Sequence, residues 1–147
     1  MPETSYELRP VGFVRSPLTH LEEAPMQGSE GAPDAWLEIE QAVLDGLDGL
    51  AVGDEIIVIT WLHRAQREIL KVHPRDDRTR PLTGVFATRS PDRPNPLGLH
   101  PVRILAIDGN SVKVGPLEAV DGTPVVDIKP VIAGARQVGQ ADGPGAR

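Results

Sequence analysis

The chain has 147 residues, enough for one domain with a modest hydrophobic core or for one domain with a loose tail. It contains no cysteine, which excludes disulfides, zinc-thiolate sites and catalysis by a thiol. The net charge of −6 argues against a general affinity for nucleic acid, and the sequence has neither a signal peptide nor an apolar run long enough to span a membrane, so we expect a cytoplasmic protein.

Short runs rich in Val, Ile and Leu recur along the chain, and most have the length of a strand. They lie at residues 8–15, 35–40, 55–63, 69–73, 83–89, 102–107, 111–115 and 124–128. Asp108-Gly-Asn110 predicts a tight hairpin, and only residues 41–50 have helical character. The sequence therefore predicts an all-β fold, a small single-sheet β-barrel with short helical and loop insertions, because closure removes exposed strand edges.

Two segments offer little to bury. Residues 19–33 are rich in Glu, Pro and Gly, and residues 133–147 are mainly Gly, Ala and Gln. We expect one barrel domain over residues 1–132 and a loose C-terminal tail over residues 133–147.

Charge is separated along the chain. Residues 60–103 hold nine Lys or Arg and four Asp or Glu, a net +5, while the remainder carries −11. The basic run at residues 73–80 includes Arg75, Arg78 and Arg80. It predicts either a local contact with a phosphate-bearing partner or a solvated loop.

The loop within residues 84–99 has a distinctive composition, with three prolines in six residues beside Arg89, Asp92, Arg93 and Asn95. Each proline fixes φ and removes a backbone donor, so the loop is stiff and presents carbonyl acceptors next to two guanidinium groups. This combination suits a polar ligand. The alternative is a rigid connection capped by arginines.

Further polar residues lie at strand ends. His63 and Arg64 close one apolar run, and Asp127 and Lys129 alternate with Ile128, so both face one side of a strand, either lumen or solvent. His63 is either functional or a simple exposed strand end. Dinucleotide, P-loop, zincin and nucleophile-elbow motifs are absent, and no metal site is expected.

The 84–99 loop resembles the signature of the TsaA-like family, whose best-known members are S-adenosylmethionine-dependent tRNA methyltransferases acting on a modified adenosine in the anticodon loop. The resemblance runs from Val11 to Pro130. It includes Val-Gly-Phe-Val-Arg-Ser-Pro at residues 11–17, Trp-Leu-His-Arg at 61–64, Asp-Gly-Thr-Pro at 121–124 and Asp-Ile-Lys-Pro at 127–130. Met26 stands where the family usually has Arg, and Val131 where an aromatic residue is common.

The resemblance implies a β-barrel that forms homodimers, with S-adenosylmethionine near the subunit interface. It places cofactor contacts at Pro25, Met26, Gln27, His63, Arg64, Arg89, Leu99, Asp127, Ile128, Lys129 and Pro130. We expect tRNA phosphates to meet Arg75, Arg78, Arg80 and Arg93.

Methyl transfer from a sulfonium is an in-line displacement that needs alignment but no metal. If the acceptor is the exocyclic amino nitrogen of threonylcarbamoyl-adenosine next to the anticodon, a proton must leave, and Asp127 or His63 is placed to accept it. The alternative is an S-adenosylmethionine-binding enzyme or sensor whose target is a small molecule other than tRNA.

Overall fold

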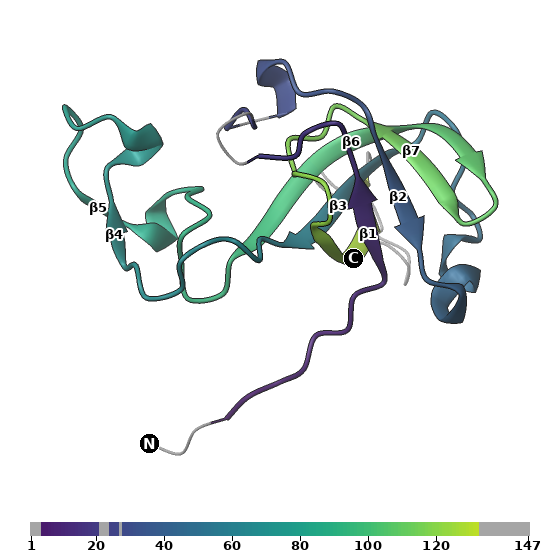
Figure 1. Ribbon diagram of the computed structural model, residues 1–147, viewed down its shortest axis with the longest axis horizontal. Coiled ribbons are helices and arrows are strands. Elements are labelled where there is room, and N and C mark those ends of the chain that lie inside the picture. The colour runs from purple at the N-terminus through teal and green to yellow at the C-terminus, as the bar shows by residue number, and fades with distance from the viewer. Residues whose placement is uncertain (1–3, 21–23, 27, 133–147) are drawn as a thin grey trace, which may run out of the picture.

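The computed structural model describes residues 4–20, 24–26 and 28–132, so the predicted tail and Gln27 lie outside the described residues. Its centre is a closed antiparallel barrel, which confirms the predicted fold class (Figure 1). The strands follow one another around the barrel in the order β1 (Gly12–Arg15), β2 (Ala35–Ile39), β7 (Ser111–Gly115), β6 (Leu97–Asp108), β3 (Glu55–Trp61) and β8 (Pro124–Pro130).

Alternation along the strands fills the barrel interior. Every second residue is buried along β2, along β3 and, in β6, up to Ile104, and the core includes Leu37, Ile56, Val58, Ile104 and Val125. Burying each such side chain stabilises the fold by about 1.5–3 kcal/mol. With so few aromatic residues, the interior is built almost entirely from branched aliphatic side chains.

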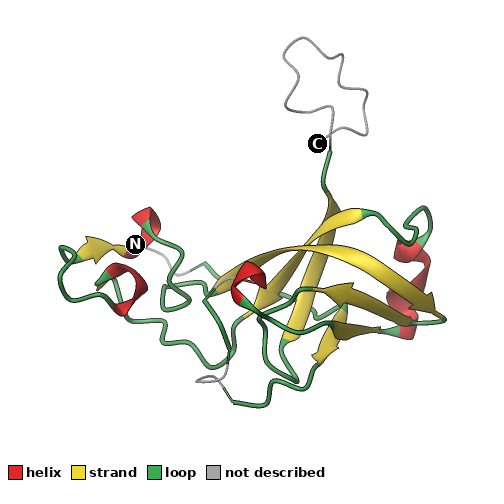
Figure 2. Ribbon diagram, turned by 90° about the horizontal axis from the view of Figure 1, so that it is seen from above, coloured by secondary structure: helices red, strands yellow, loops and turns green. Residues whose placement is uncertain are grey.

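A long excursion leaves the barrel after β3 and returns at β6. We call residues 62–96 the arm. It contains β4 (Lys71–Val72), the 3-10 turn η4 (Pro74–Asp76), β5 (Thr83–Gly84) and the 3-10 turn η5 (Val85–Ala87). β4 and β5 form a two-stranded sheet separate from the barrel. Figures 1 and 2 both show the arm projecting away from the barrel.

The remaining short elements are 3-10 turns, η2 (Gly28–Glu30) and η3 (Gln41–Leu47). η3 realises the helical character predicted for residues 41–50, and Leu44, Leu47 and Leu50 pack against the core. None of the helices in the described part of the chain is long and apolar enough to cross a membrane.

Most strand boundaries differ from the prediction by a few residues, and three differences have a clear structural reason. β1 begins at Gly12, which pairs with Ile39, the last residue of β2, although the Val11 N–H still donates to the Val125 carbonyl of β8 at 2.7 Å. The 83–89 run pairs over two residues only, since β4 offers no more, and then turns into η5. β6 begins at Leu97. β7 pairs with it only from Arg103 onward, so a free edge tolerates Pro101 inside the strand.

Candidate functional site

Strand register brings together several predicted site residues on the outside of the barrel. Leu99 on β6 pairs with Ile59 on β3, and Ile59 pairs with Asp127 on β8. The next row outward consists of Pro101, Ile57 and Lys129. We call this surface the β6–β3–β8 face. It combines an apolar centre with a carboxylate and an ammonium at its β8 edge.

A β-bulge sets the direction of Asp127. Thr60 pairs with Val125 and Ile59 with Asp127, which leaves Val126 as an extra residue in β8. A bulge re-aims the side chains that follow it. Asp127 and Lys129 therefore face the solvent side, where their charged groups lie 3.4 Å apart and both side chains are at least half exposed. The sequence predicted a shared side and left lumen or solvent open.

Arg89 reaches this face from the arm. It lines a cavity of about 390 Å³ together with Ile57, Leu99 and Pro101. No hydrogen bond or ion pair of the Arg89 side chain is found among the described residues. A guanidinium that pairs with none of the described residues and shares a cavity with apolar side chains suits a ligand that carries both an anionic group and an apolar body.

Beneath that floor lies a buried polar group. Thr60 Oγ1 is 2.7 Å from His100 Nε2, and His100 Nδ1 is 3.0 Å from Glu118 Oε1 without the alignment of a hydrogen bond. Thr60 and His100 are almost fully buried. Since Ile59 and Leu99 immediately precede them, the Thr60–His100 contact fixes β3 against β6 directly behind the face.

The other residues with predicted cofactor roles lie around this face or behind it. His63 and Arg64 follow the end of β3 and are exposed, and the Arg64 guanidinium donates to the Thr19 carbonyl at 3.4 Å. That contact holds the start of the loop bearing Pro25 and Met26. Gln27 lies outside the described residues.

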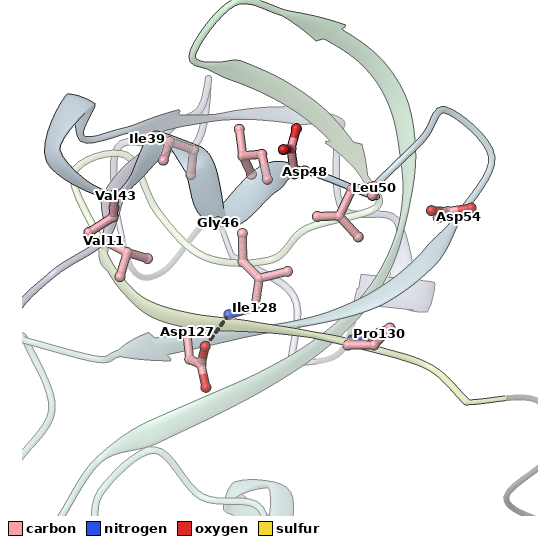
Figure 3. A pocket seen from close by; sticks show the side chains of 12 residues that line it. Val11, Ile39, Val43, Gly46, Asp48, Leu50, Asp54, Asp127, Ile128 and Pro130 are labelled. Atoms are coloured by element: carbon pink, nitrogen blue, oxygen red, sulfur yellow. Dashed lines mark hydrogen bonds between the residues drawn. The ribbon is translucent and has the colours of Figure 1, made fainter. Parts of the chain in front are cut away.

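Ile128 and Pro130 belong to a different hollow. They line a cavity of about 460 Å³ at the end of the barrel, beside η3 and near Asp48 and Asp54. Figure 3 shows Ile128 directed into this cavity and the Asp127 side chain on the opposite side of β8. The Asp127 carboxylate thus belongs to the β6–β3–β8 face, although Asp127 is also one of the residues that line the cavity.

Two arginines, Arg93 inside the loop within residues 84–99 (the proline loop) and Arg67 outside it, stabilise this loop. Arg93 donates to the carbonyls of Val85, Thr88 and Ser90 at 2.6–3.1 Å. Arg67 donates to the Pro94 carbonyl and to Asn95 Oδ1, and its guanidinium lies 5.0 Å from the Trp61 ring centroid. The predicted nucleic-acid contact of Arg93 stays a prediction, because this guanidinium already binds three carbonyls of its own loop.

The run 73–80 forms a turn that we call the basic turn. Arg75 pairs with Glu30 of η2, and Arg80 lies 3.7 Å from Asp77. Hydrogen bonds from the Thr79 side chain and backbone hold the pKa of Asp77 below its ordinary value. Arg78 is exposed. The turn presents cations, each beside a local carboxylate or solvent.

Ile57, Ile59 and Pro101 were not predicted as site residues. The run Ile-Ile-Val-Ile at residues 56–59 is apolar on both faces, a pattern typical of a strand covered on both sides. That pattern was the available signal. Within the described residues, no group of three or more His, Asp or Glu side chains is placed to hold a metal ion.

Comparison with known families shows the family to which the chain belongs. The family described as tRNA-methyltransferase O N-terminal domain matches residues 13–136, most of the chain. The chain belongs to this family.

Two relatives that the chain matches over most of their length are named as probable S-adenosyl-L-methionine-binding proteins. The chain is 50% identical over 128 residues to a probable S-adenosyl-L-methionine-binding protein of Methanocaldococcus jannaschii, covering 84% of this chain and 90% of that protein. It is 44% identical over 130 residues to a probable S-adenosyl-L-methionine-binding protein of Methanothermobacter thermautotrophicus, covering 88% and 93%.

A solved structure of a longer protein shares the same fold. The crystal structure of TrmO from Pseudomonas aeruginosa matches with a TM-score of 0.70 and 26% identity. The match covers 94% of this chain and 61% of that one, so the tRNA-methyltransferase O N-terminal domain seen here spans less than two thirds of the TrmO chain.

Proposed function

We propose that this chain is an S-adenosylmethionine-dependent methyltransferase that methylates the exocyclic amino nitrogen of threonylcarbamoyl-adenosine in tRNA. The observation that carries the proposal is the position of Arg89, whose guanidinium has no partner among the described residues and lies over the apolar floor of Ile57, Leu99 and Pro101. Membership of the tRNA-methyltransferase O N-terminal domain family supports the choice of reaction.

The residues at the β6–β3–β8 face fit the chemistry of S-adenosylmethionine. Arg89 can pair with its carboxylate, and the apolar floor can cover its adenine ring. The Asp127 carboxylate, half exposed and next to Lys129, can accept from a ribose hydroxyl or an ammonium. The loop with Pro25 and Met26 would complete the site at the end where Arg64 holds Thr19.

When bound, the cofactor supplies a methyl group on a sulfonium, so that an attacking nitrogen forms the new N–C bond as the C–S bond breaks. The protein must hold the acceptor in line and remove one proton from its nitrogen. We assign the proton to the Asp127 carboxylate, with His63 as the second candidate. Arg89 and the stiff proline loop fix the position of the donor side.

The apolar β6–β3–β8 face supports a homodimer. Leu97 and Leu99 are exposed there, and Ile57 and Ile59 are half buried. A second copy would cover this surface and exclude water from the reacting atoms. The basic turn lies on the arm, away from the barrel, where Arg75, Arg78 and Arg80 can contact tRNA phosphates.

A second function is favoured by one observation. The relatives that the chain matches over 90% and 93% of their length are named as binding proteins, whereas the chain spans only 61% of TrmO. The alternative is therefore an S-adenosylmethionine-binding enzyme or sensor with a small-molecule target.

Calorimetry and methyl transfer test the proposal together. We expect saturable binding of S-adenosylmethionine that chelator does not change, and transfer of label from its methyl group to tRNA carrying the threonylcarbamoyl group but not to tRNA lacking it. Binding without label in tRNA would favour the small-molecule alternative. No binding of S-adenosylmethionine at all would exclude both the tRNA methyltransferase and the small-molecule alternative.

A further inference from the structure

Phe86 is the most exposed apolar side chain of the arm, with 83% of its surface accessible. It is one of only two phenylalanines in the chain. It lies in η5, three residues before Arg89. We propose that Phe86 is a stacking platform for an unpaired base of a bound RNA strand, an inference that rests on the proposed tRNA substrate.

The backbone on both sides of Phe86 is fixed. Val85 is buried, its N–H donates to the Leu70 carbonyl at 2.9 Å, and its own carbonyl accepts from Arg93 at 2.6 Å. Thr88 donates to the same Val85 carbonyl from its backbone and from its hydroxyl, both at 3.0 Å. Phe86 is therefore displayed from a rigid turn, which lowers the entropy lost when a ring stacks on it.

Charge decides which partner suits this ring. The arm carries eight Lys or Arg against four Asp or Glu. Two of those carboxylates are engaged locally, since Asp92 accepts from the Gln66 N–H and Asp77 from Thr79. An exposed aromatic side chain on an arm with a net positive charge suits single-stranded nucleic acid, with cationic side chains on the phosphates and the ring on a base.

Stacking on Phe86 and charge pairing at the basic turn make separable contributions. Every base offers a face for stacking, whereas phosphates alone provide the salt-dependent part of the affinity. The affinity for a polyanion without bases should therefore not depend on Phe86. This contrast gives the experiment its two probes, a short single-stranded oligoadenylate and inorganic polyphosphate.

We expect Phe86→Ala to weaken oligoadenylate binding by about 5- to 150-fold and to leave both polyphosphate affinity and the salt slope unchanged. Phe86→Tyr and Phe86→Trp should keep the affinity, while Phe86→Leu, which is apolar but has no ring, should not. Leu82→Ala is the matched control, because Leu82 is an exposed apolar residue of the same arm at 55% accessibility. Both exposed positions should tolerate substitution, and thermal melts check this.

Three binding results would overturn the inference: equal losses of affinity for oligoadenylate and polyphosphate in Phe86→Ala, wild-type oligoadenylate affinity in Phe86→Leu, or no oligoadenylate binding at low salt. A fourth is a change in the mass of the oligomer in solution in Phe86→Ala, which would assign the ring to a contact between copies of the chain. Failure of the proposed function looks different. If oligoadenylate binding depends on Phe86 but no methyl group is transferred to tRNA, the proposed acceptor is wrong and the stacking role of Phe86 is kept. If methyl transfer to tRNA occurs but Phe86→Ala leaves the RNA affinity unchanged, the stacking role is wrong and the proposed acceptor is kept.

Discussion

Arg75 and Glu30 form an ion pair across 45 positions of sequence, joining the basic turn of the arm to η2. Their side chains are 47% and 40% exposed, so the pair contributes about 0.2–1 kcal/mol. Arg75 and Asp76 both have positive φ, 56° and 57°, a conformation that costs energy in residues with a side chain. The turn is closed by a 2.9 Å contact between His73 Nδ1 and the Arg80 carbonyl. Glu30 thus competes with any phosphate for Arg75.

Glu30→Gln should raise the affinity for inorganic polyphosphate by up to about fivefold, because it frees Arg75. Asp76→Asn is the control, since it removes a nearby carboxylate that forms no ion pair with the described residues, and asparagine tolerates a positive φ. In an Arg75→Ala background the gain should vanish. Equal gains from both neutralising changes would show a general charge effect instead. Fluorescence titration at low salt measures the polyphosphate affinity of Glu30→Gln, Asp76→Asn, Arg75→Ala and the double variant that combines Arg75→Ala with Glu30→Gln.

Arg89→Ala should lower the affinity for S-adenosylmethionine by about 10- to 100-fold, since a charge-assisted pair contributes about 1.5–3 kcal/mol. Arg75→Ala should leave that affinity nearly unchanged, because Arg75 faces η2 and not the β6–β3–β8 face. Arg89→Lys should restore part of the loss, as it keeps the charge but not the planar fork. Calorimetry decides, and small equal effects at both positions would place the cofactor elsewhere.

Gly98→Ala should lower the free energy of unfolding by about 1–3 kcal/mol, because inserted volume strains a packed interior. An added Cβ would lie 2.6 Å from both His100 Nε2 and Thr60 Oγ1. Gly84→Ala is the control, as nothing lies within 4 Å of its Cβ position and its φ is −60°. Urea unfolding of both variants provides the measurement. An unchanged midpoint in Gly98→Ala would mean that the contact between Thr60 and His100 is not tightly packed.

Glu38 should titrate below its ordinary range. The Ser111 hydroxyl donates to it at 2.6 Å, and Arg15 adds a hydrogen bond and a charge, which together lower the pKa. A depressed folded pKa contributes stability above the unfolded pKa, and this is lost as pH falls through the folded value. Ser111→Ala should therefore raise the Glu38 pKa and reduce the loss of stability on acidification. Carboxyl NMR titration checks it, and an unmoved Glu38 curve in the variant would contradict it.

Local chemistry made part of the fold predictable. The Asp108-Gly-Asn110 signal gives the β6–β7 hairpin, in which Asp108 pairs with Ser111 and Gly109 takes a positive φ. Alternation likewise predicted that Asp127 and Lys129 share a side. These features depend on neighbouring residues alone, so a single sequence contains enough information for them.

Long-range geometry was less accessible. The extra residue Val126 is defined only by the pairing of β8 with β3, and nothing near it in sequence marks a bulge. The ion pair of Arg75 with Glu30 requires the arm and η2 to meet in space. The row Leu99, Ile59 and Asp127 follows from strand register, which residue type does not encode. The roles of the predicted site residues stay predictions.

The arm connects β3 and β6, and these two strands pair directly with each other from Glu55–Arg103 to Trp61–Leu97. In topological terms the arm is an enlarged hairpin connection. Each halving of a flexible connection changes the free energy of closing it by only about 0.6 kcal/mol. Arms of other lengths and sequences could therefore be exchanged at Trp61 and Leu97 without a change in barrel register, because the pairing of β3 with β6 does not depend on the segment that connects them.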